Sequence, residues 1–151
     1  MEQRPLGRSP LKVSALALGT TNFGSDWHGV GAVEEKTARR LVDMALDAGV
    51  NLIDTADIYG RGASEEMLGR ILKGRRSTAL LATKVLGQMD LRDPASGGLG
   101  RNHILSGLDS SLKRLKTDYI DLYMPHGYDF EVPLEESLEA FHRLVSAGQE
   151  F

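Results

Sequence analysis

Residues 50–72 read VNLIDTADIYGRGASEEMLGRIL, and this stretch decides the fold because it holds one complete strand-and-helix unit. The short apolar run at 50–53 predicts a buried strand, and the glycines that follow indicate a turn. Ser64 is a residue type favoured at helix N-caps, and we expect it to begin a helix. The apolar side chains after it have the spacing of one buried helix face: Met67, Leu68, Ile71 and Leu72.

The same unit occurs four times along the chain. Short apolar segments that begin near residues 15, 50, 79 and 119 predict four strands. Amphipathic segments alternate with them, and the last has an apolar stripe that we expect to be buried: Leu134, Leu138, Phe141 and Val145. Short apolar strands that alternate with helices indicate a parallel sheet covered by helices. Ahead of the first strand, residues 4–13 are expected to form a small β-hairpin.

Two architectures have this pattern: the doubly wound sheet and the (β/α)8 TIM barrel. A doubly wound fold usually carries G-x-G-x-x-G after its first strand, whereas residues 19–24 read GTTNFG. A complete barrel needs about 250 residues, and the chain has 151. We therefore expect a single domain over 1–151 of TIM-barrel type, truncated after its fourth βα unit. It would be a half barrel preceded by the hairpin.

The composition excludes several classes of function. The chain has no cysteine, which removes disulfides, thiol nucleophiles and zinc-thiolate sites, and no metal site is expected. The net charge of −3 does not favour nucleic-acid binding. There is neither a signal-peptide stretch nor a membrane-spanning run of about 20 apolar residues. We therefore expect a cytoplasmic protein without membrane insertion.

Ionisable side chains follow the predicted strands where a barrel places its chemistry, at the carboxyl ends. Asp54 ends the second strand, Lys84 the third, and His126 lies just beyond the fourth. Tyr59 follows Asp54 by five residues. Taken singly, each has a structural explanation: a turn residue, a lysine extending to solvent, a loop histidine and a packed tyrosine. Their combination at successive strand ends favours a reactive site.

These residue types suit the reduction of a carbonyl group. Tyrosine can deliver the proton, but its free pKa is near ~10 and must be lowered. A lysine ammonium about 4 Å away favours the phenolate by roughly 4 kcal/mol at an effective dielectric of ~20. An aspartate would hold the lysine, and a histidine would orient the carbonyl oxygen. The hydride must come from a cofactor.

The stretch NLIDTADIYG at 51–60 resembles the signature of the aldo-keto reductase family. GASEEMLG at 62–69 is similar to its continuation, and ATK at 82–84 to the lysine strand of the family. LKRLKTDYIDLY at 112–123 resembles the segment that leads to the catalytic histidine. The resemblance extends from about residue 6 to 148. It is strongest to the branch of bacterial general reductases and potassium-channel β-subunits.

The resemblance implies a barrel enzyme that reduces aldehydes or ketones to alcohols with NADPH. The catalytic roles fall on Tyr59 as the acid, on Lys84 and Asp54 as its tuning pair, and on His126. The implied cofactor-binding residues are Gly19, Thr20, Thr21 and Asp54. The implied substrate-binding residues are Trp27, Tyr59 and His126.

The resemblance covers only the N-terminal half of the family, and three alternatives for the function follow. The chain is a small-molecule carbonyl reductase, a non-enzymatic regulatory module like the channel β-subunits, or an inactive half-barrel fragment. In the family, the absent half carries most cofactor contacts, so weak NADPH binding is expected of this chain. An isolated half barrel also exposes two strand edges, which predicts self-association.

Overall fold

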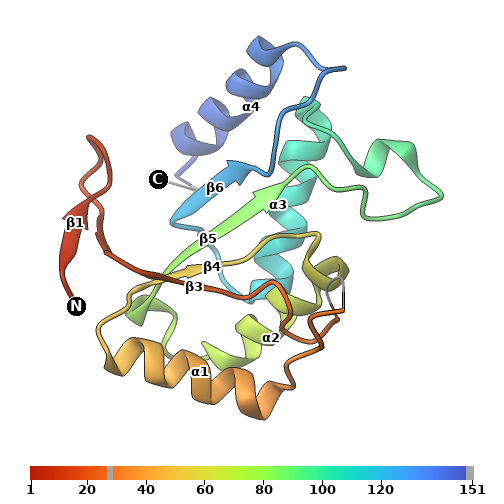
Figure 1. Ribbon diagram of the computed structural model, residues 1–151. Coiled ribbons are helices and arrows are strands. Elements are labelled where there is room, and N and C mark those ends of the chain that lie inside the picture. The colour runs from red at the N-terminus through yellow and green to blue at the C-terminus, as the bar shows by residue number, and fades with distance from the viewer. Residues whose placement is uncertain (27–28, 149–151) are drawn as a thin grey trace.

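The computed structural model describes residues 1–26 and 29–148. At its centre lies a parallel sheet in which four strands lie side by side in the order of the sequence (Figure 1). A doubly wound sheet reverses direction within its strand order, whereas this order runs straight through, as in one half of a barrel. The strands are β3 (Ala17–Gly19), β4 (Leu52–Asp54), β5 (Leu80–Val85) and β6 (Leu122–Pro125).

Within the described residues, four α-helices and three short 3-10 turns connect and cover these strands. The helices pack on one another in chain order, α1 on α2, α2 on α3, and α3 on α4. They are α1 (Glu35–Asp47), α2 (Ala63–Ile71), α3 (Arg101–Leu115) and α4 (Leu134–Ser146). The 3-10 turns are η1 (Tyr59–Gly62), η2 (Arg76–Thr78) and η3 (Pro94–Ser96). The predicted alternation of strands and helices is therefore confirmed.

The register of the sheet brings the carboxyl ends of the strands to one edge. Gly19 of β3 pairs with Asp54 of β4, and Asp54 pairs with Ala82 of β5. On the other side of β5, Lys84 pairs with Met124 of β6. Residues that follow the strands therefore converge at this edge, as the barrel hypothesis requires.

The predicted hairpin is present at the N-terminus. Strand β1 (Gln3–Pro5) pairs antiparallel with β2 (Lys12–Ser14). The Ser14 amide donates a hydrogen bond to the Asn51 side chain at 2.7 Å, and the Asn51 amide donates to Ser14 Oγ at 3.0 Å. These bonds fix the hairpin to the entry of β4, at the end of the sheet opposite the ionisable residues.

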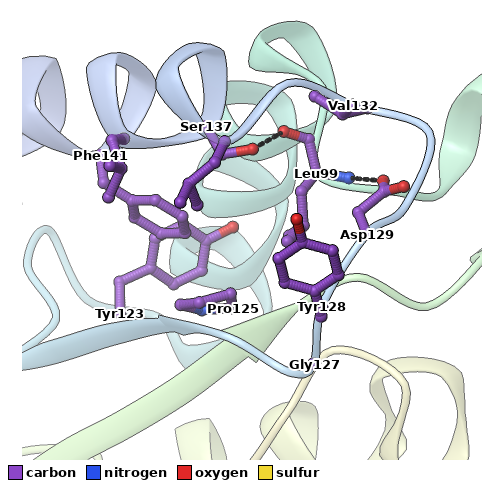
Figure 2. A pocket seen from close by; sticks show the side chains of 11 residues that line it. Leu99, Tyr123, Pro125, Gly127, Tyr128, Asp129, Val132, Ser137 and Phe141 are labelled. Carbon is purple, nitrogen blue, oxygen red and sulfur yellow. Dashed lines mark hydrogen bonds between the residues drawn. The ribbon is translucent and has the colours of Figure 1, made fainter.

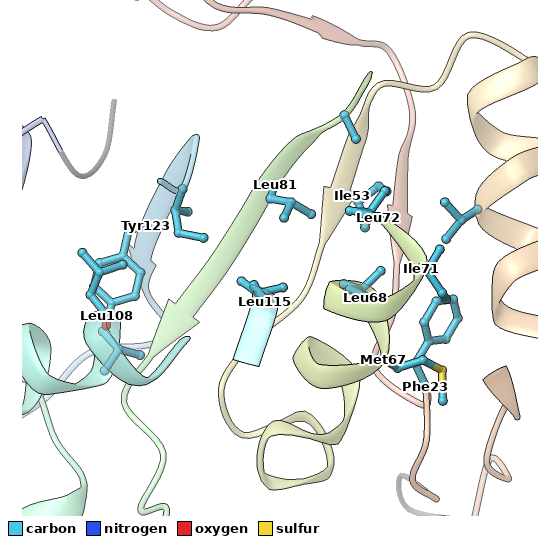
Figure 3. Packing of buried hydrophobic residues seen from close by; sticks show 14 of the residues in the cluster. Phe23, Ile53, Met67, Leu68, Ile71, Leu72, Leu81, Leu108, Leu115 and Tyr123 are labelled. Carbon is cyan, nitrogen blue, oxygen red and sulfur yellow. The ribbon is translucent and has the colours of Figure 1, made fainter. Parts of the chain in front are cut away.

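The hydrophobic core lies between the sheet and the helices that cover it (Figure 3). Ile53 and Leu81 of adjacent strands face Leu68 of α2, and all three side chains are fully buried. Burying a leucine or isoleucine of this size contributes about 1.5–3 kcal/mol each. The stripe predicted for α2 is confirmed, because Met67, Leu68, Ile71 and Leu72 are all buried.

Two local predictions were wrong. Ser64 is not an N-cap, because α2 begins at Ala63 after Gly62, whose φ of +95° suits glycine. The stripe predicted for α4 lies largely on its exposed face. Exposed fractions are 51% for Leu134, 58% for Leu138 and 48% for Val145. The buried face of α4 consists instead of Ser137, Ala140 and Leu144.

The outer face of α4 is apolar and exposed, and β6 forms one edge of the sheet. Strand β3 forms the other edge. Helix α4 thus buries Ala140 and Leu144 in the described part of the chain and leaves Leu134, Leu138 and Val145 exposed. In the described ranges, no helix combines the length and the hydropathy of a membrane span.

Candidate active site

Asp54, Tyr59, Lys84 and His126 lie at the carboxyl edge of the sheet. Asp54 is the last residue of β4, and His126 follows β6 directly. Lys84 is the penultimate residue of β5 rather than its end, because the strand continues through Val85. Tyr59 begins η1, and its amide donates to Ala56 O at 3.2 Å.

The ammonium of Lys84 is fixed by three oxygens. Its Nζ lies 2.7 Å from each carboxylate oxygen of Asp54 and donates to the Thr55 carbonyl oxygen, also at 2.7 Å. The Lys84 side chain is only 14% exposed and that of Asp54 31%. A charge held in such a partly buried pair is screened much less than a surface charge. The lysine charge therefore stays in one place at the strand ends.

The Tyr59 ring contacts both this charge and His126. The Lys84 Nζ lies 5.1 Å from the centre of the Tyr59 ring, within the range of a cation–π contact. The His126 ring meets the Tyr59 ring edge-on, with centroids 5.5 Å apart and an interplanar angle of 76°. Tyr59 is buried, so both neighbours limit the positions that its ring can adopt.

The position of His126 lowers its pKa below the usual value of 6.5. Burial is the main cause, since it disfavours the charged imidazolium. The positive charge of Lys84 acts in the same direction, and Asp54 opposes both. Near neutral pH the imidazole is therefore uncharged, with one N–H to donate and one nitrogen to accept.

A buried hydroxyl cluster that the sequence did not reveal supports the end of β4. Ser64 Oγ lies 2.8 Å from Thr20 Oγ1 and 3.0 Å from Thr55 Oγ1, and it donates to the Thr20 carbonyl at 2.9 Å. Thr20 Oγ1 donates to the Asp54 carbonyl at 3.0 Å. Helix α2 is thus tied to the loop after β3 and to the segment that carries Asp54.

An ion pair behind β5 was also missed. Glu65 is fully buried and accepts from Arg114 Nε and from Thr83 Oγ1, each at 2.6 Å. Thr83 directly precedes Lys84 in β5. A buried carboxylate needs such partners, because an unpaired one costs several kcal/mol. The sequence motif gave no signal for this pair, since its members lie 49 positions apart.

The implied cofactor residues differ in accessibility. Gly19 is exposed, and nothing lies within 4 Å of the position that a Cβ would take there. Thr21 is half-buried, and the Asp54 carboxylate is partly exposed. Thr20 is fully buried, with its hydroxyl committed to the cluster around Ser64. Gly19 pairs with Asp54 across β3 and β4, so open backbone adjoins the residue that carries this carboxylate. Trp27 lies outside the described residues.

A separate apolar cavity of about 290 Å³ lies between β6, the loop after it and α4 (Figure 2). Tyr123 and Phe141 face each other there, with ring centroids 5.5 Å apart. Ser137 Oγ donates to the Leu99 carbonyl at 2.8 Å and connects α4 to the loop before α3. None of the four strand-end residues lines this cavity, so we do not assign it to the reaction site.

The sequence and the fold match a known family. The aldo/keto reductase family model covers residues 15–149, and the chain belongs to this family. Its structure resembles the holo form of aldo-keto reductase AKR11C1 from Bacillus halodurans, with a TM-score of 0.85 and 39% identity. That match covers 99% of this chain and 48% of AKR11C1.

Two curated relatives show the range of the family. The uncharacterized oxidoreductase YrpG of Bacillus subtilis is 43% identical, over 99% of this chain and 47% of the relative. The second relative is a Schizosaccharomyces pombe protein whose name provisionally assigns it as a voltage-gated potassium channel subunit beta. It is 40% identical, over 98% of this chain and 43% of the relative. The chain thus spans about half the length of the relatives that it matches.

Proposed function

We propose that the protein is an oxidoreductase that reduces aldehydes or ketones to alcohols with NADPH, with Tyr59 as the general acid. One observation carries this proposal. The Lys84 ammonium is fixed by Asp54 and Thr55 and lies 5.1 Å from the Tyr59 ring, which the His126 ring meets edge-on. A phenol, a fixed cation and an imidazole at one strand-end edge form a proton-donating site.

In this proposal, Tyr59 gives its phenolic proton to the carbonyl oxygen as the substrate is reduced. The Lys84 charge stabilises the phenolate that remains, and the Asp54 carboxylate keeps the ammonium in position. His126, uncharged near neutral pH, donates its N–H to the same oxygen and orients the carbonyl. NADPH, when bound, supplies the hydride.

The residues of this chain that would hold NADPH are Gly19, Thr21 and Asp54. The buried hydroxyl of Thr20 would support the loop after β3 through its hydrogen bonds to Asp54 and Ser64. AKR11C1, a structural relative, is described in a holo form, which supports cofactor use by this chain. Trp27 remains a prediction for the substrate side, as does the cytoplasmic location. The choice of NADPH over NADH rests on the family resemblance.

We further propose that the strand-end site works inside a closed assembly. The exposed apolar face of α4 and the edge strands β3 and β6 support a partner that covers them. Self-association of two chains would bury the apolar face of α4 and the edges of the sheet. The isolated chain is then expected to bind NADPH weakly when it is dilute.

The test is the rate of NADPH oxidation with a panel of aldehydes and ketones, measured for the chain and for Tyr59→Phe. The variant keeps the ring that Lys84 and His126 contact and removes only the hydroxyl. We expect a loss of roughly 100-fold or more, the usual size of a general-acid contribution. Equal rates in the two proteins would remove Tyr59 from the mechanism.

The second candidate is a regulatory module without turnover, which the similarity to the Schizosaccharomyces pombe protein favours. In that case the chain would bind NADPH but would not oxidise it with any carbonyl compound. Fluorescence titration of NADPH together with the turnover assay separates the two functions. Neither binding nor turnover, at concentrations where the chain self-associates, would indicate the inactive half barrel.

A further inference from the structure

Asp57 is a buried acid that the proposed mechanism does not use. It lies two residues before Tyr59 and is 1% exposed. Both of its carboxyl oxygens are buried without a hydrogen-bond partner in the described part of the chain. An ionised carboxylate in such a place costs several kcal/mol, so the side chain is expected to keep its proton or to gain partners by moving.

The surroundings of Asp57 favour its neutral form. Burial is the main cause that raises the pKa of Asp57 to about 7, and the negative charge of Glu65 on α2 is the next. Arg114 on α3 and Lys84 on β5 oppose the rise. The Ile58 amide also opposes it, without forming a hydrogen bond of good geometry. Arg114 is itself paired with Glu65 at 2.6 Å, which limits its effect on Asp57.

The backbone of Asp57 joins the two strands that carry the reaction site. Its amide donates to the Lys84 carbonyl at 3.2 Å, directly beyond the paired part of β4 and β5. Two residues later, the Tyr59 amide donates to the Ala56 carbonyl. The segment from 55 to 59 is therefore a tight turn held against the end of β5. A displacement of Asp57 would be transmitted to Tyr59 through two peptide units.

A polar cavity of about 210 Å³ adjoins Asp57 on the side of α3 and the loop before it. Ser106, Ser110 and His103 of α3 line it, and Asp93 and Ser96 lie on the loop side. His103 Nδ1 lies 2.8 Å from the Gly98 carbonyl, which fixes this nitrogen as the donor. The cavity exceeds the roughly 30 Å³ that one water occupies in the liquid. A carboxylate that ionised could therefore be hydrated from this side.

We propose that Asp57 is a positioning residue for Tyr59: as a neutral acid it keeps the 55–59 turn packed on the end of β5, and when ionised it moves toward the polar cavity and loosens that turn. The charged groups that act on it are Glu65, Lys84 and Arg114, and His103 and Asp93 line the same cavity. The consequence for turnover rests on the proposed function. The coupling of Asp57 to Tyr59 does not.

The coupling is measured by NMR on the 151-residue chain, with labelled Asp carboxyl and Tyr ring carbons, from about pH 5.5 to 8.5. We expect the Asp57 carboxyl and the Tyr59 ring to change with a common midpoint near 7, the pKa of Asp57. The change at Tyr59 should vanish in Asp57→Asn, which keeps the shape and cannot ionise. It should persist in Glu66→Gln, which removes an exposed carboxylate from the same helix as Glu65.

His126 contacts the Tyr59 ring and also titrates, so it requires its own variant. In His126→Gln the change near pH 7 should remain. The proposal would be overturned if the change of the Tyr59 ring signal were lost in His126→Gln or survived in Asp57→Asn. It would also be overturned if the Tyr59 ring signal of the unmodified chain did not change with pH. If Asp57→Asn does not fold, the result with His126→Gln decides the question.

The catalytic consequence has a separate readout. We expect kcat/KM to fall roughly 3- to 10-fold as Asp57 ionises, and this inflection should be absent from Asp57→Asn. An activity profile without the inflection, alongside a normal NMR coupling, would overturn the positioning role in catalysis. If no carbonyl compound is reduced, the proposed function fails, while the NMR result still decides whether Asp57 positions Tyr59.

Discussion

The Nζ atom of Lys84 lies 5.1 Å from the centre of the Tyr59 ring. The two residues come from different βα units, and the parallel register of β4 and β5 brings them together. Because both Asp54 oxygens also bind the ammonium at 2.7 Å, the Lys84 side chain stays near the Tyr59 ring and does not extend into solvent. The strand register therefore determines the electrostatic environment of the proposed acid.

Replacing Lys84 by methionine should abolish the proposed acid function. The substitution keeps an unbranched side chain, one atom shorter, but removes the charge and leaves Asp54 without its cation. We expect NADPH oxidation to fall by roughly 100-fold or more. Lys113→Met, an exposed lysine on α3, is the matched control and should stay near the unmodified rate. A rate within twofold for Lys84→Met would contradict the role of the ammonium.

His126 should titrate below the value of a free histidine. Burial and the Lys84 charge lower its pKa from 6.5, so the folded protein takes up this proton less readily than the unfolded chain. The stability contributed by this group is present above 6.5 and is lost as pH falls through the folded pKa. NMR titration of the imidazole signal that disappears in His126→Gln checks this. A midpoint at or above about 6.5 would contradict it.

Asp57→Asn should stabilise the protein at alkaline pH. The pKa of Asp57 rises from 3.8 to about 7 on folding, so its contribution is fully present below 3.8 and is lost as pH rises through about 7. Over that interval the loss corresponds to at most about 4 kcal/mol. An asparagine at this position does not titrate, so it adds no such pH dependence to the free energy of unfolding. The difference in this free energy between Asp57→Asn and the unmodified chain, measured by urea unfolding, should therefore grow from pH 5 to pH 8.

The control for this pH dependence is Asp118→Asn, which changes an exposed aspartate. Its difference from the unmodified chain should be similar at the two pH values. If Asp57→Asn also showed one constant difference, the buried carboxyl would not be linked to folding in this way.

Periodicity sufficed for the order of the elements, because each strand and helix is defined by local apolar spacing. It failed for α4, where two apolar faces compete and the spacing of Leu134 and Leu138 is as regular as that of Ala140 and Leu144. Packing of α4 on α3 decides between such faces, and local sequence does not contain that information. The misplaced cap at Ser64 has a similar cause, since its hydroxyl is committed to Thr20 and Thr55.

The strand-end residues could be predicted because parallel strands place their carboxyl ends at one edge. The supporting contacts could not. Glu65 reads as an ordinary acidic residue of a first helical turn, yet it pairs with Arg114, 49 positions away. Asp57 reads as one more polar turn residue, and only its burial without partners distinguishes it. Such properties arise from tertiary contacts alone.

Gly69→Ala should destabilise the contact between α2 and α3. A Cβ at Gly69 would lie 2.9 Å from the Leu115 carbonyl oxygen, and this neighbour is backbone rather than a flexible side-chain end. Overpacking of this kind costs about 1–3 kcal/mol, which urea unfolding can measure. Gly100→Ala, where the nearest atom is 3.8 Å away, should cost less than about 0.5 kcal/mol. Equal costs at the two positions would show that the helices separate easily.

Leu138→Glu should weaken self-association of the chain. Leu138 is 58% exposed on the apolar outer face of α4, and it also lines the cavity between α4 and β6. A carboxylate there would have to be desolvated in any interface that covers this face, at a cost of several kcal/mol. Light scattering after size exclusion, over a range of concentrations, should show a larger monomer fraction for the variant.

Leu91→Glu is the matched control for this prediction, because Leu91 is 72% exposed on the loop after β5, away from α4. The same substitution there changes the net charge equally but leaves the outer face of α4 intact. We expect its association to equal that of the unmodified chain. If both variants shifted the equilibrium alike, net charge would be the cause. If neither did, or if the unmodified chain were monomeric throughout, the α4 face would not be the site of self-association.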